Sequence, residues 1–94
     1  MIAGKTTSGF EFEINENIKK DYRFIRAYRK AHSKDEHEQL IGADDLLTIT
    51  LGEDGADRLM EFLAEEDGTV PSDKVMNELA EIISIAGKDE SLKN

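Results

Sequence analysis

The segment TSGFEFEIN, residues 7–15, decides how the chain begins to fold. At its centre, FEFEI alternates three apolar residues with two glutamates, a period typical of a β-strand with one buried and one solvated face. Gly9 can adopt the positive φ of a tight turn, so residues 2–6 are the predicted partner strand of a hairpin. Because two strands alone are marginally stable, the phenylalanine side of this hairpin must pack on helices.

Helical spacing of apolar residues follows the hairpin. Asn15 is a good N-cap, and the first helix is predicted over residues 16–32. Either Ser33 or Asp35 can cap a second helix. Two more helices are predicted over residues 54–65 and 72–86.

The stretch LLTITL leaves open whether residues 47–51 end the second helix or form a third strand. Its β-branched residues favour a strand. The apolar stripe that runs from Leu40 through Ala43 and Leu47 favours a helix, and Gly52 can then occupy the position after its last turn. The helix is the preferred prediction because a third strand has no obvious partner.

The expected fold is therefore α+β and mostly helical, with an N-terminal β-hairpin packed on three to four α-helices. Residues 1–87 are predicted to form a single globular domain, and the charged residues 88–94 a mobile tail. The 94 residues include no cysteine, so disulfides and thiolate metal sites are excluded. There is no apolar run long enough to span a membrane and no apolar signal core at the N-terminus, which predicts a cytoplasmic protein.

Charge is distributed unevenly along the chain, whose net charge is −9. Residues 1–34 carry eight basic and four acidic side chains, a net charge of +4. Residues 35–94 carry four basic and seventeen acidic side chains, a net charge of −13. A body this acidic repels phosphate backbones, so nucleic-acid binding is disfavoured.

The segment KKDYRFIRAYRK, residues 19–30, nevertheless forms a basic stripe. On one continuous helix, its cations Lys19, Arg23, Arg26 and Lys30 fall within an arc of roughly 60°. The stripe can be a solvated face with local ion pairs, or it can contact the acidic surface of a neighbouring copy. Nucleic-acid binding ranks last of the three readings.

Catalytic and metal-binding patterns are weak in this sequence. His32 and His37 are five residues apart, whereas metal pairs on one helix face need a spacing of three or four. The segment LAEEDGTVPSDK, residues 63–74, resembles an EF-hand loop, but Leu63 and Lys74 stand where calcium requires carboxylates. The prediction is a protein without catalytic residues, cofactor or metal.

Three longer segments carry a resemblance to a known family: TSGFEFEIN, LLTITLGEDGADRLMEFL and EEDGTVPSDKVMNELAEI. In this order they resemble the small tail assembly chaperones of long-tailed bacteriophages and prophages, particularly those of Gram-positive hosts. The β-branched TITL departs from the plainer leucine-rich helix expected there. The resemblance implies a protein–protein interaction function in which the chain coats the tape measure protein while the tail is built.

The resemblance further implies that the protein acts in the cytoplasm of the bacterial host and is absent from the mature virion. Members are often made in two lengths by a programmed frameshift, and the longer form recruits the tail tube protein. Leu92-Lys93-Asn94 can be encoded with the slippery heptamer A-AAA-AAC, so we hypothesise a frameshift at Lys93-Asn94. An ordinary charged terminus is the equal alternative.

A chaperone of this kind needs exposed apolar anchors for a helical client. The candidates are Phe24, Tyr28, Met60, Phe62 and Met76, of which one or two are expected to be exposed. Self-association through the basic stripe is a further expectation. The alternative function is a small acidic inhibitor that mimics nucleic acid to block a host enzyme; it would display rows of carboxylates and lack an apolar groove.

Overall fold

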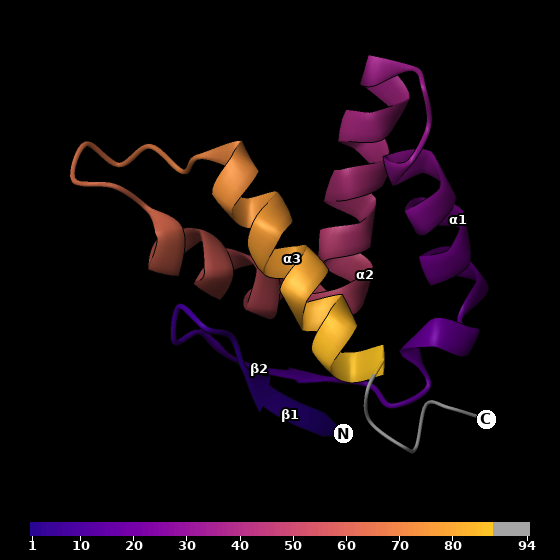
Figure 1. Cartoon of the computed structure of the whole chain (residues 1–94), viewed down its shortest axis with the longest axis horizontal. Helices are drawn as coiled ribbons and strands as arrows, with labels where there is room; N and C mark the ends of the chain where they lie inside the picture. Colours follow the sequence, from indigo (N-terminus) through magenta and orange to yellow (C-terminus); the bar gives the residue numbers. More distant parts are fainter. Residues whose placement is uncertain (88–94) are drawn as a thin grey trace.

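The computed structural model describes residues 1–87 of the chain, and the predicted tail and frameshift site lie outside the described residues (Figure 1). Two strands come first, followed by a short 3₁₀ helix, η1, and three α-helices. The elements are β1 (Ile2–Lys5), β2 (Glu11–Ile14), η1 (Ile18–Lys20), α1 (Tyr22–Ala31), α2 (Glu36–Leu63) and α3 (Ser72–Gly87). The described part is therefore mostly helical, with the antiparallel N-terminal hairpin that the sequence predicts.

The hairpin forms with the predicted alternation. β1 and β2 pair antiparallel, with Ile2 opposite Ile14 and Lys5 opposite Glu11. Gly9 takes a φ of 100° in the connecting turn, as expected. Phe12 in β2 and Phe10 just before it are buried, because this side of the hairpin packs on α2 and α3. The intervening Glu11 and Glu13 are exposed.

The first helix begins later than predicted, and this is a correction. Asn15 caps only a turn, in which its side-chain oxygen accepts the N–H of Asn17. The short helix η1 follows this turn and ends at Lys20. The cap of α1 is Asp21, which has an extended backbone and whose carboxylate accepts the N–H of Arg23 at 2.8 Å. A helix cannot continue through an extended residue, so the rotation of α1 is set by Asp21 rather than by Asn15.

The buried side of α1 is narrow. Phe24 and Ala27 pack into the core, whereas Tyr22, Ile25 and Tyr28 are exposed. The buried side is set by the close packing of α1 on α2.

Helix α2 resolves the open question at residues 47–51 in favour of a helix. Asp35 is its N-cap and accepts the backbone N–H groups of His37 and Glu38. Gly52 interrupts the helical backbone with φ 76° and ψ 167°, a combination essentially restricted to glycine. Figure 1 shows the consequence: the second half of α2 turns sharply away from the first half and runs across the top of the hairpin.

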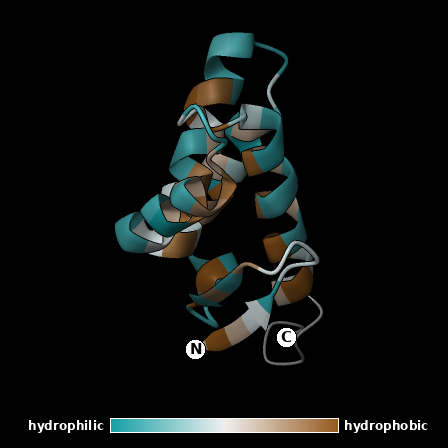
Figure 2. Cartoon of the chain, turned by 90° about the vertical axis from the view of Figure 1, so that its left-hand side faces the viewer, coloured by the Kyte–Doolittle hydropathy of each residue, from teal (hydrophilic) through white to brown (hydrophobic). Residues whose placement is uncertain are grey.

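The core joins the hairpin, α1, both halves of α2 and α3. Its largest fully buried side chains are Ile14, Leu59 and Ile82, which come from β2, the second half of α2 and α3 respectively. Hydrophobic and hydrophilic residues alternate along the helices in Figure 2, as expected for helices with one buried side.

The loop between α2 and α3 is closed by Asp67, whose carboxylate accepts the N–H of Thr69 at 2.9 Å. In this loop the Lys74 amine lies 3.6 Å from a carboxylate oxygen of Glu65. Lys74, which stands where an EF-hand loop needs a carboxylate, thus forms an ion pair.

One hydrogen-bonded link ties α3 to the hairpin turn and gives a pH prediction. The carboxylate of Glu81 accepts the N–H of Thr7 at 2.7 Å and its hydroxyl at 2.6 Å, and these bonds hold the pKa of Glu81 below its usual value. A lowered pKa in the folded state stabilises the fold above the unfolded pKa, about 4.3 for glutamate. The difference in unfolding free energy between wild type and Glu81→Gln should be largest at neutral pH and shrink as the pH falls below that value. Urea titrations between pH 3 and 7 measure this; a difference that does not change with pH would contradict it.

A buried carboxylate on α3 gives a second stability prediction. Glu78 is 5% exposed, and within residues 1–87 its Oε2 has no hydrogen-bond partner. An unpaired buried polar group costs about 1–3 kcal/mol, so Glu78→Met should raise the unfolding free energy by about that amount. Chemical denaturation at pH 7 measures the change. A loss of stability would instead mean that the carboxylate is favourably bound.

Candidate protein-binding groove

The predicted apolar anchors do not all lie at the surface. Phe24 is buried at 6% exposed and belongs to the core, which corrects its assignment as an anchor. The other four candidates, Tyr28, Met60, Phe62 and Met76, are between 36% and 45% exposed. The structure therefore supplies more exposed anchors than the one or two expected.

These exposed residues fall into two groups. Tyr28 and Met76 line one groove, together with the strongly exposed Leu40. Met60 and Phe62 lie on the second half of α2, where the Phe62 ring packs against Phe10 with 5.4 Å between ring centroids. Phe62 thus partly covers the hairpin and contributes to the packing of the fold.

The groove has a volume of about 430 Å³ and receives side chains from all three α-helices. Its lining residues are Tyr28, Ala31, His32, Gln39, Leu40, Ala43, Leu46, Met76, Leu79, Ala80 and Ile83. Apolar side chains predominate, as is typical of sites that bind apolar ligand or protein surfaces. The groove extends over eight residues on each of α2 and α3, about two helical turns.

Small residues create the hollow and large ones border it. Ala31, Ala43 and Ala80 come from α1, α2 and α3 respectively, and their short side chains leave the space open. Tyr28 is held by its neighbours, since its ring stacks on His32 with 4.3 Å between centroids. Met76 is unbranched and flexible, which suits a surface that adapts to its partner.

Leu40 is the site residue that sequence reasoning missed. The stripe pattern places it in the core of the second helix, yet it is 68% exposed. It lies in the second turn of α2, and its exposure depends on how α1 and α3 pack on α2, which only the tertiary arrangement shows. A leucine near the start of a long capped helix, with few apolar neighbours before it, is the weak signal available in the sequence.

The basic stripe is not assembled as predicted, and this is a further correction. The helix break at Asp21 separates Lys19 from α1, and the Lys19 amine lies beside Gly87 at the C-terminal end of α3. A cation there is favoured by the helix dipole. Arg23 forms an ion pair with Asp21 at 2.7 Å, which lowers the pKa of that carboxyl.

The remaining two cations also have local contacts. The Arg26 guanidinium lies 5.4 Å from the centre of the Tyr22 ring. The stem of Lys30 packs beside Gly42, where α1 approaches α2 most closely. Each of the four cations of the stripe therefore has a contact within its own chain.

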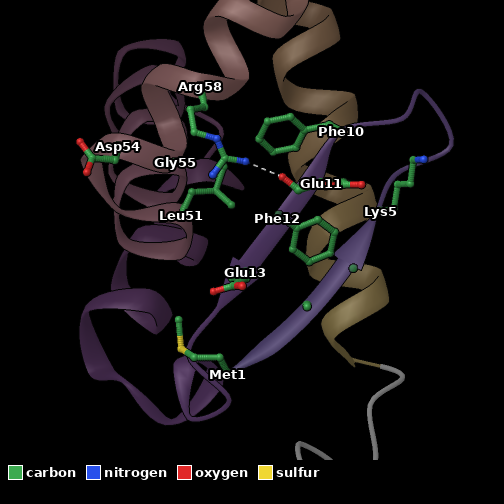
Figure 3. A pocket seen from close by; sticks show the side chains of 12 residues that line it. Met1, Lys5, Phe10, Glu11, Phe12, Glu13, Leu51, Asp54, Gly55 and Arg58 are labelled. Carbon is green, nitrogen blue, oxygen red and sulfur yellow. Dashed lines mark hydrogen bonds between the residues drawn. The ribbon is translucent and has the colours of Figure 1, made fainter.

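A larger hollow of about 880 Å³ lies between the hairpin and the second half of α2 (Figure 3). Arg58 reaches across it and donates to the backbone oxygen of Glu11 at 2.6 Å, with its guanidinium 5.3 Å from the centre of the Phe10 ring. Charged side chains surround this space, and the phenylalanines beside it are buried. It offers less exposed apolar surface than the groove, so the groove is the stronger candidate.

Titratable groups do not gather in the groove. Within residues 1–87, no group of three or more histidine or acidic residues is placed to hold a metal ion. His32 and His37 are both exposed. In the same residues, no helix is both long and apolar enough to cross a membrane.

Comparison with protein-family models, with curated proteins and with solved structures found no match to the chain.

Proposed function

We propose that this chain is a non-catalytic binding protein that acts as a tail assembly chaperone of a long-tailed phage or prophage. Its client is the tape measure protein, which it holds in the host cytoplasm while the tail is assembled. The observation that carries the proposal is the exposed apolar groove formed by α1, α2 and α3. The sequence resemblance supplies the class of client.

The dimensions of the groove suit a helical client. Two turns of an amphipathic helix present apolar side chains at positions i, i+3, i+4 and i+7, the pattern used in helix-in-groove recognition. Leu40 and Met76 offer large apolar surfaces at one end, and Ile83 lies at the other. A long helical protein presents such segments repeatedly, so several chaperone molecules can bind one client.

The groove favours this function over the acidic inhibitor. A nucleic-acid mimic works through carboxylates and has no use for an exposed tyrosine, leucine and methionine around one hollow. Burying these side chains against a partner removes apolar surface from water, which is the main driving force of most protein association. Recruitment of the tail tube protein by a frameshifted longer form remains part of the proposal.

Co-expression with the tape measure protein encoded nearest to this gene tests the proposal. The two proteins should co-purify, and the client should remain soluble only when the chaperone is present. An unrelated long helical protein serves as the control and should not be retained. Failure to co-purify with the tape measure protein, with both partners expressed and folded, would contradict the proposal.

A further inference from the structure

A second surface runs along the outer edge of β2. Thr6 and Phe10 form a hydrogen-bonded pair next to the hairpin turn, since the N–H of Thr6 donates to the carbonyl oxygen of Phe10 at 2.9 Å. Hydrogen-bonded and non-hydrogen-bonded pairs alternate along an antiparallel ladder. Glu11 and Glu13 therefore belong to non-hydrogen-bonded pairs, and their backbone N–H and C=O groups point away from β1.

The contact of Arg58 agrees with this direction. From the second half of α2, its guanidinium donates to the backbone oxygen of Glu11 at 2.6 Å. Within residues 1–87, no other bond reaches the outward groups of Glu11 and Glu13. Outward groups on a sheet edge are the template on which an extended peptide adds a further strand. The guanidinium of Arg58 occupies a place that an N–H of such a strand would take.

The large hollow in Figure 3 borders this edge, with the second half of α2 as its other wall. That wall consists of Leu51, Asp54, Gly55 and Arg58. The hollow has a volume of about 880 Å³, which is within the range of ligand sites. It shares no residue with the apolar groove, so a peptide bound here leaves the groove free.

The charges along the edge define which side chains an added strand should carry. Residues directly opposite each other on neighbouring strands share one face of the sheet, so they would meet the exposed carboxylates of Glu11 and Glu13. Lys5 lies opposite Glu11 within the hairpin, whereas Glu13 lies opposite the uncharged Ala3. Asp54 adds a further carboxylate from α2. Cations opposite the two glutamates are therefore favoured.

The residue between these two cations meets a different environment. Successive side chains of a strand point to opposite faces, so this residue points to the face on which Phe10 and Phe12 pack. Leu51, which is half-buried, lines the hollow as well. An apolar side chain fits this position.

We propose that the outer edge of β2 binds an extended segment of another protein, in which basic and apolar residues alternate. The segment adds a third strand to the hairpin, with its cations opposite Glu11 and Glu13. It is antiparallel to β2, since antiparallel pairing is the more stable per residue. One of its N–H groups replaces the Arg58 guanidinium on the oxygen of Glu11. This contact is independent of the groove and of the proposed chaperone function.

A short peptide provides the probe. Ser-Lys-Val-Lys-Val-Ser, acetylated and amidated at its ends, would be titrated into the ¹⁵N-labelled chain. The backbone amides of Glu11 and Glu13 should shift, and that of Met76 in the groove should not. Because few hydrogen bonds hold one short strand, the dissociation constant is expected in roughly the millimolar range. Ser-Glu-Val-Glu-Val-Ser has the same alternation with opposite charge and should not bind.

Glu13→Pro and Glu13→Ala separate the backbone contact from the charge. Both variants lack the carboxylate, but only proline also lacks the outward N–H. Proline is tolerated on edge strands where the N–H faces away from the ladder. Glu13→Pro should bind the lysine peptide about tenfold more weakly than Glu13→Ala, since it loses one more hydrogen bond. Circular dichroism establishes that both variants are folded.

N-methylated peptides test the same contact without altering the protein. In the antiparallel arrangement, the N–H groups of the two lysines face β2 and those of the two valines face away. Methylating both lysine nitrogens should weaken binding at least about tenfold, whereas methylating both valine nitrogens should leave it close to that of the parent peptide.

Three results would overturn the proposal. The first is the absence of amide shifts at millimolar peptide, or shifts at Ala3 and Lys5 on the opposite edge instead. The second is an equal loss of binding for the two methylated peptides. The third is a shift of the Glu11 and Glu13 amides with the concentration of the chain alone, which would assign the edge to a second copy.

Discussion

Gly42→Ala is expected to destabilise the fold by about 3 kcal/mol or more, the upper range for overpacking a core. Gly42 is buried where α1 crosses α2. A Cβ at this position would lie 2.5 Å from the carbonyl carbon and from Cβ of Lys30, and closer still to the backbone nitrogen of Ala31. Backbone atoms cannot rotate away as a side-chain end can, so the helices must separate.

Two effects oppose each other at this position, and their magnitudes decide the sign. Alanine favours a helix over glycine by about 1 kcal/mol, which alone predicts a more stable protein. The clash with α1 is larger and should lower the melting temperature by more than about 10 °C. Gly87→Ala is the control, because its new methyl meets only the amine end of the Lys19 side chain, which can move away. Thermal unfolding that ranked Gly42→Ala as the more stable variant would show that α1 is not packed as described.

Ala80→Glu is expected to reduce affinity for the tape measure protein by about 100-fold or more, the size of effect seen at binding hot spots. Ala80 is exposed on the α3 wall, one turn after Met76. A glutamate there fills the groove and must lose its hydration when a client binds. Since glutamate is a good helix former, the fold should be preserved.

Asn77→Glu is the matched control for the groove variant. It adds the same charge to an exposed position of α3 that does not line the groove. Isothermal titration calorimetry with a soluble tape measure segment should show near wild-type affinity for this control. Equal affinity of Ala80→Glu and wild type would place the client elsewhere on the surface.

Local sequence signals predict much of the fold. The alternation around Phe12, the turn at Gly9 and the cap at Asp35 each act over a few residues, and all three appear in the structure. The start of α1 was predicted wrongly because Asn15 and Asp21 are both good caps, and only tertiary packing selects between them. The same error led to the prediction that Lys19 belongs to a continuous basic stripe.

The candidate site was less accessible to sequence reasoning. The sequence predicts Tyr28 and Met76 as candidate anchors, but their meeting in one groove depends on how α1 and α3 pack against α2. Leu40 was missed because an apolar stripe on a helix does not reveal which of its residues the neighbouring helices bury. Outside the groove, the burial of Glu78 was not predicted, since it follows from the position of α3 on the hairpin and α2.

The most direct test of the central claim, that the groove binds a helical segment of another protein, is nuclear magnetic resonance mapping. Helical peptides from the tape measure protein would be titrated into the ¹⁵N-labelled chain, and the backbone amide shifts recorded. The largest changes are expected at groove residues such as Leu40, Ala43, Met76 and Ala80, with the hairpin unaffected. Changes confined to the hairpin or to the second half of α2, or no changes with any segment, would contradict the account.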